Sequence, residues 1–352
     1  MTAVHQAVAG AGPYDAVSEQ TRAWRRLLGE AGYGGGDHAA QIDPRVRGGF
    51  AALDALTPEP GDLLVIRYSA WSPALTGLLD LPQRLLLVYH NITPAEYLWN
   101  HSAGLAVQCA VGRIQLPAFA GRAQVAVADS GYNAAELRAA GAAEARVVPI
   151  LFEPGRLEVR GRPPAGEGPL VLVVGRLVPN KRHDRVLDAF AAYQSACAPG
   201  ARLVLAGEPL TPGYARLIER FVHSSGARNV TVTGGLAQPE LNAAYAAADV
   251  LLTLSEHEGF CIPLLEAFHF GLPVVAAPNA AMPGVAGDAA LWTDGDPAVT
   301  AELLDLAVRD AALRAELGRR GRARLEHFRS ERTGAEIRAA VADALASPPA
   351  GG

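Results

Sequence analysis

The sequence predicts an α/β protein with two domains, each built around a parallel sheet. Short apolar runs that end in Gly, Ser or Asp alternate with amphipathic stretches, which is typical of consecutive βαβ units. The alternation occurs in two series, and the Pro- and Gly-rich stretch Glu153–Pro169 separates them like a linker. The length of 352 residues also favours two compact domains over one.

The first series indicates an N-terminal domain over residues 1–155. Its apolar runs have the length of strands, and its amphipathic stretches have the period of helices. The predicted strands are Val4–Val8, Leu63–Tyr68, Leu85–His90 and Val125–Asp129, and the predicted helices are Ala16–Glu30 and Ala134–Ala140.

The second series indicates a C-terminal domain over residues 156–330, and its alternation is more regular. The predicted strands are Leu170–Gly175, Arg202–Gly207, Val230–Thr233, Val250–Leu254 and Pro273–Ala276. The predicted helices are His183–Tyr193, Gly213–His223, Pro239–Ala247 and Ile262–Phe270, with further helices in the region Pro297–Phe328.

A last amphipathic stretch runs from about Glu331 to Ala346. We expect residues 331–352 to form a C-terminal helix that packs back toward the N-terminal domain. The Pro- and Gly-rich residues after this helix predict a disordered tail.

The charge balance argues against a nucleic-acid partner. The formal net charge is -5, and no run of Lys or Arg suggests a tail that binds phosphodiesters. The three cysteines, Cys109, Cys197 and Cys261, are far apart, which supports neither a disulfide framework nor a Cys-rich zinc site. The cysteine pattern favours a protein of the reducing cytoplasm.

No membrane span is predicted, because every apolar run breaks before about 18 residues. The apolar stretch Thr2–Ala11 lacks a basic leading region, so we interpret it as a core strand and not as a signal peptide. Membrane contact is expected to be peripheral at most. The oligomeric state stays open.

The strongest local signal for chemistry is the segment Val173–Phe190. Open α/β sheets bind ligands beyond the carboxyl ends of their strands. Here a strand ends at Gly175, where a ligand could approach the backbone, and the cations Arg176 and Lys181 follow before a helix begins. A guanidinium and an ammonium could flank a diphosphate.

The amino-acid composition also supports a functional role for Lys181. It is the only lysine in the chain, and the other 30 of the 31 basic residues are arginine. A lysine kept at the start of a helix in such a sequence suggests that a compact positive charge is needed there. The alternative is a solvated surface lysine.

The second signal is the segment Ser255–Val275, which places Glu258 and Glu266 eight positions apart. Glu258 falls in a loop after a predicted strand, and Glu266 falls inside the following helix, so the two carboxylates are not on one exposed helix face. The amides at this helix start suit an anion, and the carboxylates suit sugar hydroxyls. The four candidate amides belong to Gly259, Phe260, Cys261 and Ile262. Alone, Glu266 could equally be a capping or surface residue.

The first series offers weaker candidates. His90 and Asn91 end an apolar strand, where a histidine could donate to a sugar or phosphate oxygen, although a structural histidine is the alternative. Gly10 and Gly12 follow the first strand and permit close approach of a ligand. Asp15 stands where a dinucleotide fingerprint needs its third glycine, so NAD is not implied.

Other chemistries find little support. The sequence has no GxxxxGK[ST], GxSxG, HExxH or CxxC motif. Asp129 and Ser130 favour helix capping over catalysis. The cluster Glu256, His257 and Glu258 could suggest a metal, but adjacent loop positions rarely converge on one ion, so no metal site is predicted.

Taken together, these segments resemble glycosyltransferase family 4, whose members are retaining enzymes of the GT-B fold. GRLVPNKRHD is similar to the family's GR...K phosphate segment, and EGFCIPLLEA is similar to its EGFG...E element. VYHNITP and Met282–Trp292 also resemble the family, so the likeness extends over nearly the whole chain. Cys261 and Arg182 depart from the pattern, because many members have Gly there.

The resemblance implies two Rossmann-like domains that face an interdomain cleft, with a nucleoside-diphosphate sugar held mostly by the second. It implies that Arg176 and Lys181 neutralise the leaving diphosphate and that Glu266 binds the ribose. Gly207 and Leu236 lie where such enzymes commonly hold the base.

By the same resemblance, Glu258 and the amides of Gly259 and Phe260 would hold the sugar hydroxyls, and His90 would approach the sugar from the other domain. Family members need no divalent metal and no other cofactor. The expected activity is transfer of a hexose from a UDP- or GDP-sugar to a hydroxyl of a saccharide or small molecule. The alternatives are an epimerase or phosphorylase of the same fold, or a nucleotide-sugar-binding protein without activity.

Overall fold

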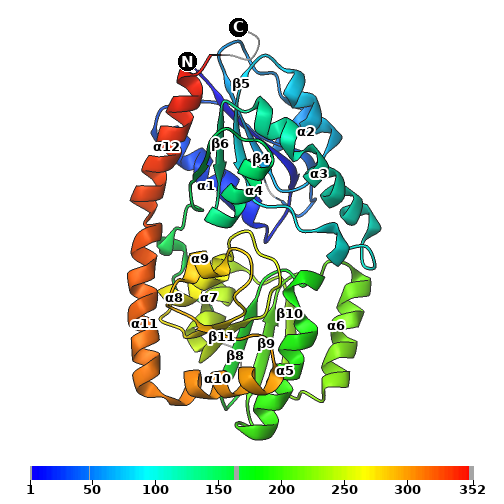
Figure 1. Ribbon diagram of the computed structural model, residues 1–352, viewed down its shortest axis with the longest axis vertical. Helices are drawn as coiled ribbons and strands as arrows, with labels where there is room; N and C mark the ends of the chain where they lie inside the picture. Colours follow the sequence, from blue (N-terminus) through cyan, green and yellow to red (C-terminus); the bar gives the residue numbers. More distant parts are fainter. Residues whose placement is uncertain (1, 47, 162–165, 349–352) are drawn as a thin grey trace. The chain divides into compact units, whose positions relative to one another are not determined.

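The computed structural model describes residues 2–46, 48–161 and 166–348 (Figure 1). They divide into two compact units. The first unit comprises the described residues up to Glu96, Ala103–Leu151 and those from Phe328 onward. The second comprises Tyr97–Ser102 and Phe152–His327. The linker centre at 162–165 and the predicted disordered tail at 349–352 lie outside the described residues.

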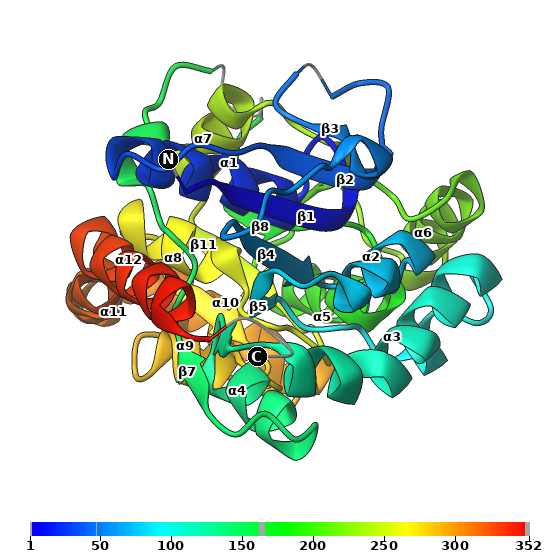
Figure 2. The same cartoon turned by 90° about the horizontal axis from the view of Figure 1, so that it is seen from above.

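In the first unit, the described residues form a sheet of seven parallel strands in the order β3-β2-β1-β4-β5-β6-β7, and Figure 2 shows β1 beside β2. The strands are β1 Val4–Ala11, β2 Asp37–Ile42, β3 Ala51–Ala52, β4 Leu63–Tyr68, β5 Arg84–Tyr89, β6 Val125–Ala128 and β7 Ala145–Val147. Strand β4 is buried at every position, as expected for a strand covered on both faces.

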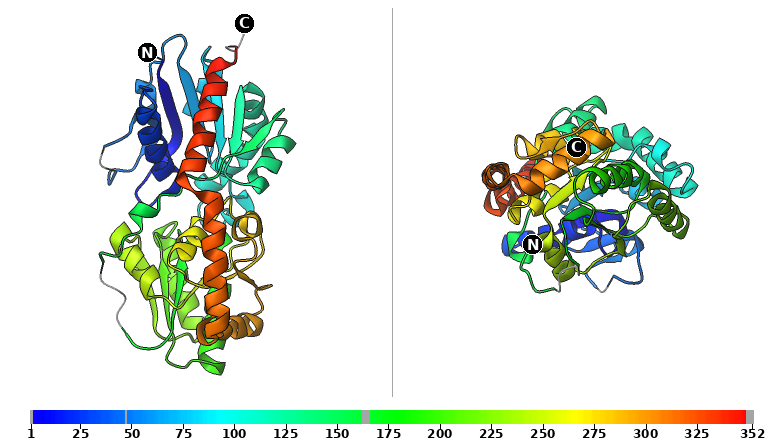
Figure 3. Two further views of the ribbon diagram at one scale, coloured as in Figure 1. Left: turned by 90° about the vertical axis from the view of Figure 1, so that its left-hand side faces the viewer. Right: turned by 90° about the horizontal axis from the view of Figure 1, so that it is seen from below.

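The α-helices of the first unit are α1 Ala16–Glu30, α2 Pro73–Gly77, α3 Ala103–Arg122, α4 Gly131–Ala139 and α12 Ser330–Ala346. Helices α1 and α12 share one core with alternate residues of β1, β4, β5 and β6. Trp24 and Leu28 of α1 and Ile337 and Val341 of α12 are buried in it. Figure 3 shows α12 running along this sheet, so the C-terminal helix completes the core of the N-terminal fold.

In the second unit, the described residues form a sheet of six parallel strands in the order β10-β9-β8-β11-β12-β13. The strands are β8 Leu170–Val174, β9 Arg202–Ala206, β10 Val230–Gly234, β11 Val250–Thr253, β12 Val274–Ala276 and β13 Leu291–Trp292. The α-helices are α5 His183–Ala196, α6 Pro212–Ser225, α7 Gln238–Ala247, α8 Ile262–His269, α9 Met282–Ala286, α10 Pro297–Arg309 and α11 Ala311–Leu325.

The core of the second unit joins β8, β9 and β11 to α5, α6 and α10. Phe190 and Tyr193 of α5 are fully buried there, as is Leu304 of α10. This packing places β8 and β11 side by side, so the loops that leave their carboxyl ends begin next to each other. The two strongest sequence motifs occupy these loops.

The predicted pair of parallel-sheet α/β units is confirmed, and all nine predicted strands and the individually placed helices are present. Elements β4 and α1 have the predicted bounds. The elements β2, β3, β7, β13, α2, α3 and α9 were not predicted. Helix α3 was missed because it consists mainly of small residues and has little apolar periodicity, and it also contains Pro117. Strand β2 was missed because it begins with the polar pair Asp37 and His38.

Candidate functional site

The loops that follow β8 and β11 are hydrogen-bonded to each other through Asn180. The backbone N–H of Glu256 donates to the carbonyl oxygen of Asn180 at 2.8 Å. The Asn180 side-chain amide in turn donates to the carbonyl oxygen of His257 at 2.9 Å. Asn180 is buried, so these bonds fix the two loops in register. Asn180 was not among the predicted site residues, although it lies in the segment GRLVPNKRHD.

Lys181 and Glu258 form an ion pair at this junction. The Lys181 ammonium lies 2.6 Å from Oε1 of Glu258, and both side chains are largely buried, at 15% and 12% exposure. Burial works to lower the pKa of Lys181, but the charge of Glu258 and its hydrogen bond outweigh burial and raise that pKa. The structure therefore brings together the two charged groups of the two predicted motifs and keeps Lys181 protonated.

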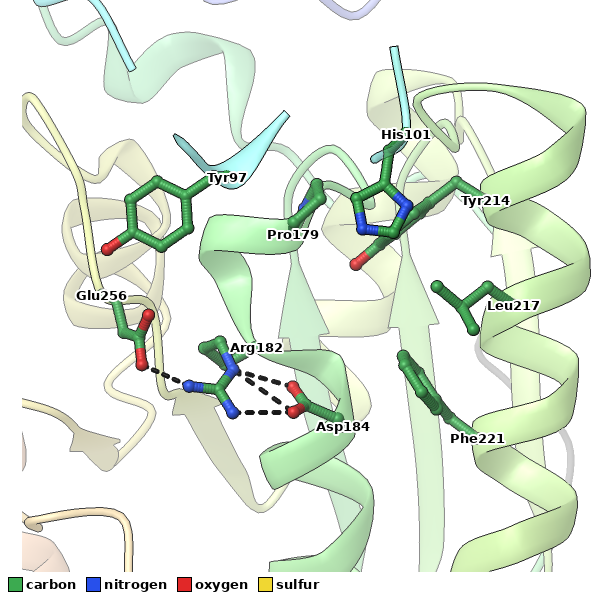
Figure 4. A pocket seen from close by; sticks show the side chains of 9 residues that line it. All are labelled: Tyr97, His101, Pro179, Arg182, Asp184, Tyr214, Leu217, Phe221 and Glu256. Atoms are coloured by element: carbon green, nitrogen blue, oxygen red, sulfur yellow. Dashed lines mark hydrogen bonds and ion pairs between the residues drawn. The ribbon is translucent and has the colours of Figure 1, made fainter. Parts of the chain in front are cut away.

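Arg182 forms a second set of contacts across the same loops. Its guanidinium donates to Oδ2 of Asp184 at 2.7 Å and also pairs with Oε1 of Glu256 (Figure 4). Arg182 adopts a left-handed conformation with φ of 50°, and α5 begins directly after it at His183. The departure from the family's glycine therefore leaves the helix entry intact.

Two glycines allow this loop to approach its neighbours. Gly175 has φ of 133°, and a Cβ placed on it would lie 2.8 Å from the Lys181 ammonium. A Cβ on Gly207, after β9, would lie 2.0 Å from the carbonyl oxygen of Gly175. Gly207 therefore needs glycine because of a backbone clash, and Gly175 because of its positive φ and because a Cβ would displace the Lys181 side chain. Leu236, the other residue predicted near a base, is half-buried in the loop between β10 and α7.

Arg176 comes directly after Gly175 and differs from the other cations of the site. Its side chain is exposed, and within the described ranges it has no ion-pair partner. The neighbouring Leu177 is buried and exchanges backbone hydrogen bonds with Glu208 and Leu210. This pairing holds the Arg176 backbone against the loop that follows β9, so the guanidinium is available to an anion.

The turn from Glu258 into α8 is built around Cys261. Cys261 precedes α8 in a left-handed conformation with φ of 77°, which is uncommon for a residue with a Cβ. Burial raises the pKa of its thiol, so the side chain stays neutral. Gly259 and Phe260 lie in this turn, and Ile262 is the first residue of α8. The predicted loop-to-helix junction is therefore present.

Glu266 lies on α8 and is held by a tyrosine that the sequence analysis did not identify. The hydroxyl of Tyr245, on α7, donates to Oε2 of Glu266 at 2.7 Å. Burial raises the pKa of Glu266, and the bond from Tyr245 opposes that rise. Tyr245 itself is buried and stacks on Phe270 with ring centroids 5.6 Å apart. Glu266 is therefore a positioned carboxylate and not a free surface residue.

In the first unit, His90 lies between Asp129 and Arg67. Its Nδ1 is 2.7 Å from Oδ2 of Asp129, and its Nε2 is 3.0 Å from Nη1 of Arg67. A guanidinium can only donate, so Nε2 accepts a hydrogen bond from Arg67. The proton of the neutral ring is then on Nδ1, which donates a hydrogen bond to Asp129. Both ring nitrogens are thus engaged inside this unit, and the predicted approach of His90 to a sugar stays a prediction.

Arg67 is fully buried and was not recognised from the sequence. It donates to Oε1 of Gln6 at 2.9 Å and stacks over the ring of Trp24 at 4.4 Å. Burial lowers the pKa of Arg67 to about 9, although the charges of Asp129 and Asp37 oppose this shift. The capping prediction is correct for Ser130, which accepts from the N–H of Asn133, and wrong for Asp129, whose carboxylate binds His90 instead.

Gly10 and Gly12 lie at the end of β1 and just beyond it. A Cβ on either would meet only ordinary van der Waals contacts, at 3.9 Å and 3.7 Å, so space for a side chain exists at both. The amide of Gly12 donates to Oγ of Ser18 at 3.1 Å. Asp15, which interrupts the dinucleotide pattern, caps α1 by accepting from the N–H of Ser18. The local geometry therefore reflects helix capping.

The acidic cluster beside the site does not converge on one point. Glu256 pairs with Arg182, and Glu258 pairs with Lys181. Across the described ranges, no three His, Cys, Asp or Glu side chains gather as metal ligands. None of the helices in the described part of the chain combines the length and apolarity that a bilayer crossing requires.

Comparison with known proteins matches the site-bearing unit. A family model described as glycosyl transferases group 1 matches residues 157–324. The chain is 34% identical over 136 residues to a GDP-mannose-dependent alpha-(1-6)-phosphatidylinositol monomannoside mannosyltransferase of Mycobacterium tuberculosis, covering 36% of this chain and 34% of that protein. It is 31% identical over 215 residues to a D-inositol 3-phosphate glycosyltransferase of Salinispora arenicola, covering 58% and 48%. The matches thus span less than half the length of these relatives.

Solved structures match over the whole chain. A sucrose-phosphate synthase from Thermosynechococcus elongatus superposes with a TM-score of 0.79 at 18% identity, covering 98% of this chain and 100% of the other. Anabaena Alr3699/HepE, solved in complex with UDP and glucose, superposes with a TM-score of 0.71 at 17% identity, covering 97% and 99%. At these identities, the likeness shows the fold.

Proposed function

We propose that this chain is a retaining glycosyltransferase. The match of residues 157–324 to the family model of group 1 glycosyl transferases supports this proposal. The chain has the GT-B fold, with two Rossmann-like parallel-sheet units. In the proposed reaction, a hexose moves from a UDP- or GDP-sugar to a hydroxyl of a saccharide or small molecule. The observation that carries the proposal is the Lys181–Glu258 pair at the carboxyl ends of adjacent strands.

The donor is proposed to be a nucleoside-diphosphate hexose. One relative is named as GDP-mannose-dependent, and one structural neighbour was solved with UDP and glucose. Arg176 is exposed and Lys181 is held protonated, so two cations follow β8 where a diphosphate would need them. In this proposal Glu266, fixed by Tyr245, binds the ribose hydroxyls.

The main chemical task is to stabilise the leaving diphosphate. Breaking the bond from the sugar to the diphosphate builds negative charge on the leaving group, and a preorganised cation or amide there supplies about 3 kcal/mol. Arg176 and Lys181 provide this charge without a metal in the proposed mechanism. Glu258 is engaged by Lys181, so it suits hydrogen bonding to sugar hydroxyls better than covalent attack. Front-face attack assisted by the departing phosphate is therefore the proposed route to retention.

The proposed setting is the cytoplasm, with the donor and a hydroxyl acceptor as partners. The three cysteines are free thiols, which suits a reducing compartment. Any membrane contact in this proposal is peripheral.

The proposal is tested by neutralising the ion pair without leaving one charge uncompensated. The variant Lys181→Gln with Glu258→Gln removes both charges and keeps polar side chains of similar length. We expect turnover of UDP- or GDP-hexose, measured as released nucleoside diphosphate, to fall by roughly 100-fold or more. The melting temperature should change little by comparison.

The matched control neutralises an exposed pair on α12 by Arg332→Gln with Glu336→Gln, whose side chains are 3.1 Å apart. This surface pair should contribute little to stability or turnover. Wild-type protein that releases no nucleoside diphosphate from either donor, with any acceptor, would disprove the enzymatic proposal. Equal turnover in the two double variants would remove Lys181 and Glu258 from the mechanism.

A further inference from the structure

The second unit contains a cavity of about 310 Å³ next to the joined loops. Its volume is at the lower end of the range for small-molecule sites. Figure 4 shows the nine side chains that line it, which are Tyr97, His101, Pro179, Arg182, Asp184, Tyr214, Leu217, Phe221 and Glu256. Lys181 and Glu258, the residues assigned to the donor, are not among them. The cavity is therefore a separate place from the proposed diphosphate site.

The charges in the cavity disfavour an anionic ligand. Arg182 is the only Lys or Arg side chain in the lining, and its guanidinium is already paired with the carboxylates of Asp184 and Glu256. One positive and two negative groups leave the lining with a net charge of -1. A phosphate would have to displace one of the two carboxylates from Arg182 and would still face the other, whereas Lys181 is paired with a single carboxylate.

Two oxygen atoms that line the cavity make no hydrogen bond within the described ranges, the hydroxyl of Tyr214 and Oε2 of Glu256. Tyr214 is only 4% exposed, and in the described part of the chain its hydroxyl has no hydrogen-bond partner. Figure 4 shows this hydroxyl pointing from α6 into the cavity. Oε2 of Glu256 also lacks a partner in the described ranges, because Arg182 and Arg185 both contact Oε1. Both oxygen atoms can therefore take part in hydrogen bonds with a polar ligand.

Helix α6 also gives the cavity two apolar side chains. Leu217 and Phe221 lie three and seven residues after Tyr214, on the same face of α6. His101 meets the Tyr214 ring edge-on, with centroids 5.1 Å apart. A ligand for this cavity therefore has an apolar face and hydroxyl groups at its edge, and it carries no negative charge.

We propose that this cavity binds one neutral sugar ring, with its C–H face against Leu217 and Phe221 and its hydroxyls toward Tyr214 and Glu256. The assignment of that ring to the acceptor rests on the proposed transferase function. Arg182 and Glu256 lie one and two residues from Lys181 and Glu258, so the same two loops would serve both substrates.

The test measures direct binding of probes without donor, by saturation-transfer NMR and isothermal titration calorimetry. The probes are D-glucose and D-mannose, glucose 6-phosphate as the anionic counterpart, and glucosamine as the cationic one. We expect a neutral hexose to bind and the phosphate to bind at least about tenfold more weakly. Equal or tighter binding of the phosphate, preference for the amine, or no hexose binding at millimolar concentration would each overturn the proposal.

The variant Tyr214→Phe removes the hydroxyl and keeps the ring. It should weaken hexose binding about threefold to tenfold, the effect of one hydrogen bond. The control Tyr33→Phe changes a half-buried tyrosine of the first unit and should leave binding unchanged. Hexose binding that Tyr214→Phe does not alter would place the site elsewhere.

Failure of the cavity proposal can be distinguished from failure of the transferase proposal, because different measurements test them. Release of nucleoside diphosphate by the wild-type protein tests the enzyme, whereas hexose binding without donor tests the cavity. In Tyr214→Phe, donor hydrolysis should stay at the wild-type rate while the KM for a saccharide acceptor rises. Donor turnover with no cavity binding would reject the cavity proposal alone.

Discussion

A Cβ at Gly175 would lie 2.8 Å from the ammonium of Lys181, six residues further along the chain. The absence of a side chain at Gly175 therefore creates the space in which Lys181 reaches Glu258. The backbone at Gly175, with φ of 133°, is also one that residues with a Cβ rarely adopt. This relationship makes the glycine part of the charged site.

Gly175→Ala should displace Lys181 and strain the loop. We expect a loss of about 1 to 3 kcal/mol in the free energy of unfolding and a fall in turnover of roughly 100-fold. Gly226→Ala is the control, because Gly226 also has positive φ, at 72°, but a Cβ placed on it would have no neighbouring atom within 4 Å. The Gly226→Ala variant should have a lower free energy of unfolding but the turnover of the wild type, measured as released nucleoside diphosphate. Full activity of Gly175→Ala would contradict the displacement.

Gly207→Ala should act mainly on stability. The new Cβ would lie 2.0 Å from the Gly175 carbonyl oxygen, which is a backbone atom of the neighbouring loop. Because the N–H of Gly175 is bonded to the carbonyl oxygen of Ala206 at 2.9 Å, the clash strains the backbone at the ends of β8 and β9, and we expect destabilisation on the order of 4 kcal/mol or more. Urea unfolding of the purified variant measures the change in the free energy of unfolding. A change below about 1 kcal/mol would show that the two loops move apart and relieve the clash.

His183 makes the folded state sensitive to acid. Its imidazole is fully buried, and neither ring nitrogen has a hydrogen-bond partner in the described part of the chain. Burial, with the nearby charge of Lys181, lowers its pKa from the ordinary value of 6.5 to about 3. The unfolded chain therefore takes up a proton below pH 6.5 while the folded chain does not. Stability should fall by about 1.4 kcal/mol per pH unit between these values.

His183→Leu should remove this contribution to the pH dependence and leave stability at about pH 7 unchanged or higher, since no hydrogen bond is lost. Urea unfolding at about pH 7.5 and about pH 5 measures the difference. The control is His223→Leu, at an exposed position of α6, which should keep the pH dependence of the wild type. Parallel pH profiles for wild type and His183→Leu would show that the buried imidazole is not responsible.

Asp129→Asn should destabilise the first unit. Asp129 is the leading counter-charge to the buried Arg67, so its neutralisation lowers the pKa of Arg67 below about 9 and leaves a poorly compensated buried charge. We expect a loss of about 3 kcal/mol in the free energy of unfolding. Asp80→Asn, at an exposed position, serves as the control in the same urea titration. An equal effect of the two substitutions would mean that Asp129 has no special role.

Tyr245→Phe tests whether Glu266 is held for nucleotide binding. Without the hydroxyl, the carboxylate loses the bond that opposes the effect of burial, so the pKa of Glu266 rises further. We expect the KM for the donor to rise about threefold to tenfold while kcat changes little. If kcat falls and KM stays constant, Glu266 acts in the transition state and not in binding.

The second unit was predicted more completely than the first. Its strands are continuous apolar runs, such as Leu170–Val174, and they end at glycines or polar residues that are easily recognised. In the first unit, β2 begins with Asp37, which is buried because Gln6 and Arg25 bind its carboxylate. A strand whose polar residues are satisfied by distant partners carries no local sign of burial.

In the candidate site, too, some residues could be predicted from the local sequence and others could not. Gly175, Lys181 and Glu258 could be found because they follow apolar strands, and Glu266 because it lies in the helix after one of these loops. Asn180, Tyr245 and Arg67 could not, because their importance comes from partners that are distant in sequence. The sequence singled out the groups suited to a diphosphate, and the structure identified those that hold them in place.

Two parallel-sheet α/β units, and a lysine and a glutamate in loops after two strands, follow from the sequence alone, because hydrophobic period and strand ends are local properties. That these loops meet is a property of the tertiary structure, because β8 and β11 are adjacent in the sheet although about 80 residues separate them in the chain. Their pairing brings Lys181 to Glu258 at 2.6 Å and shapes the cavity beside them. Contacts between distant segments depend on sheet order, which local residue preferences do not specify.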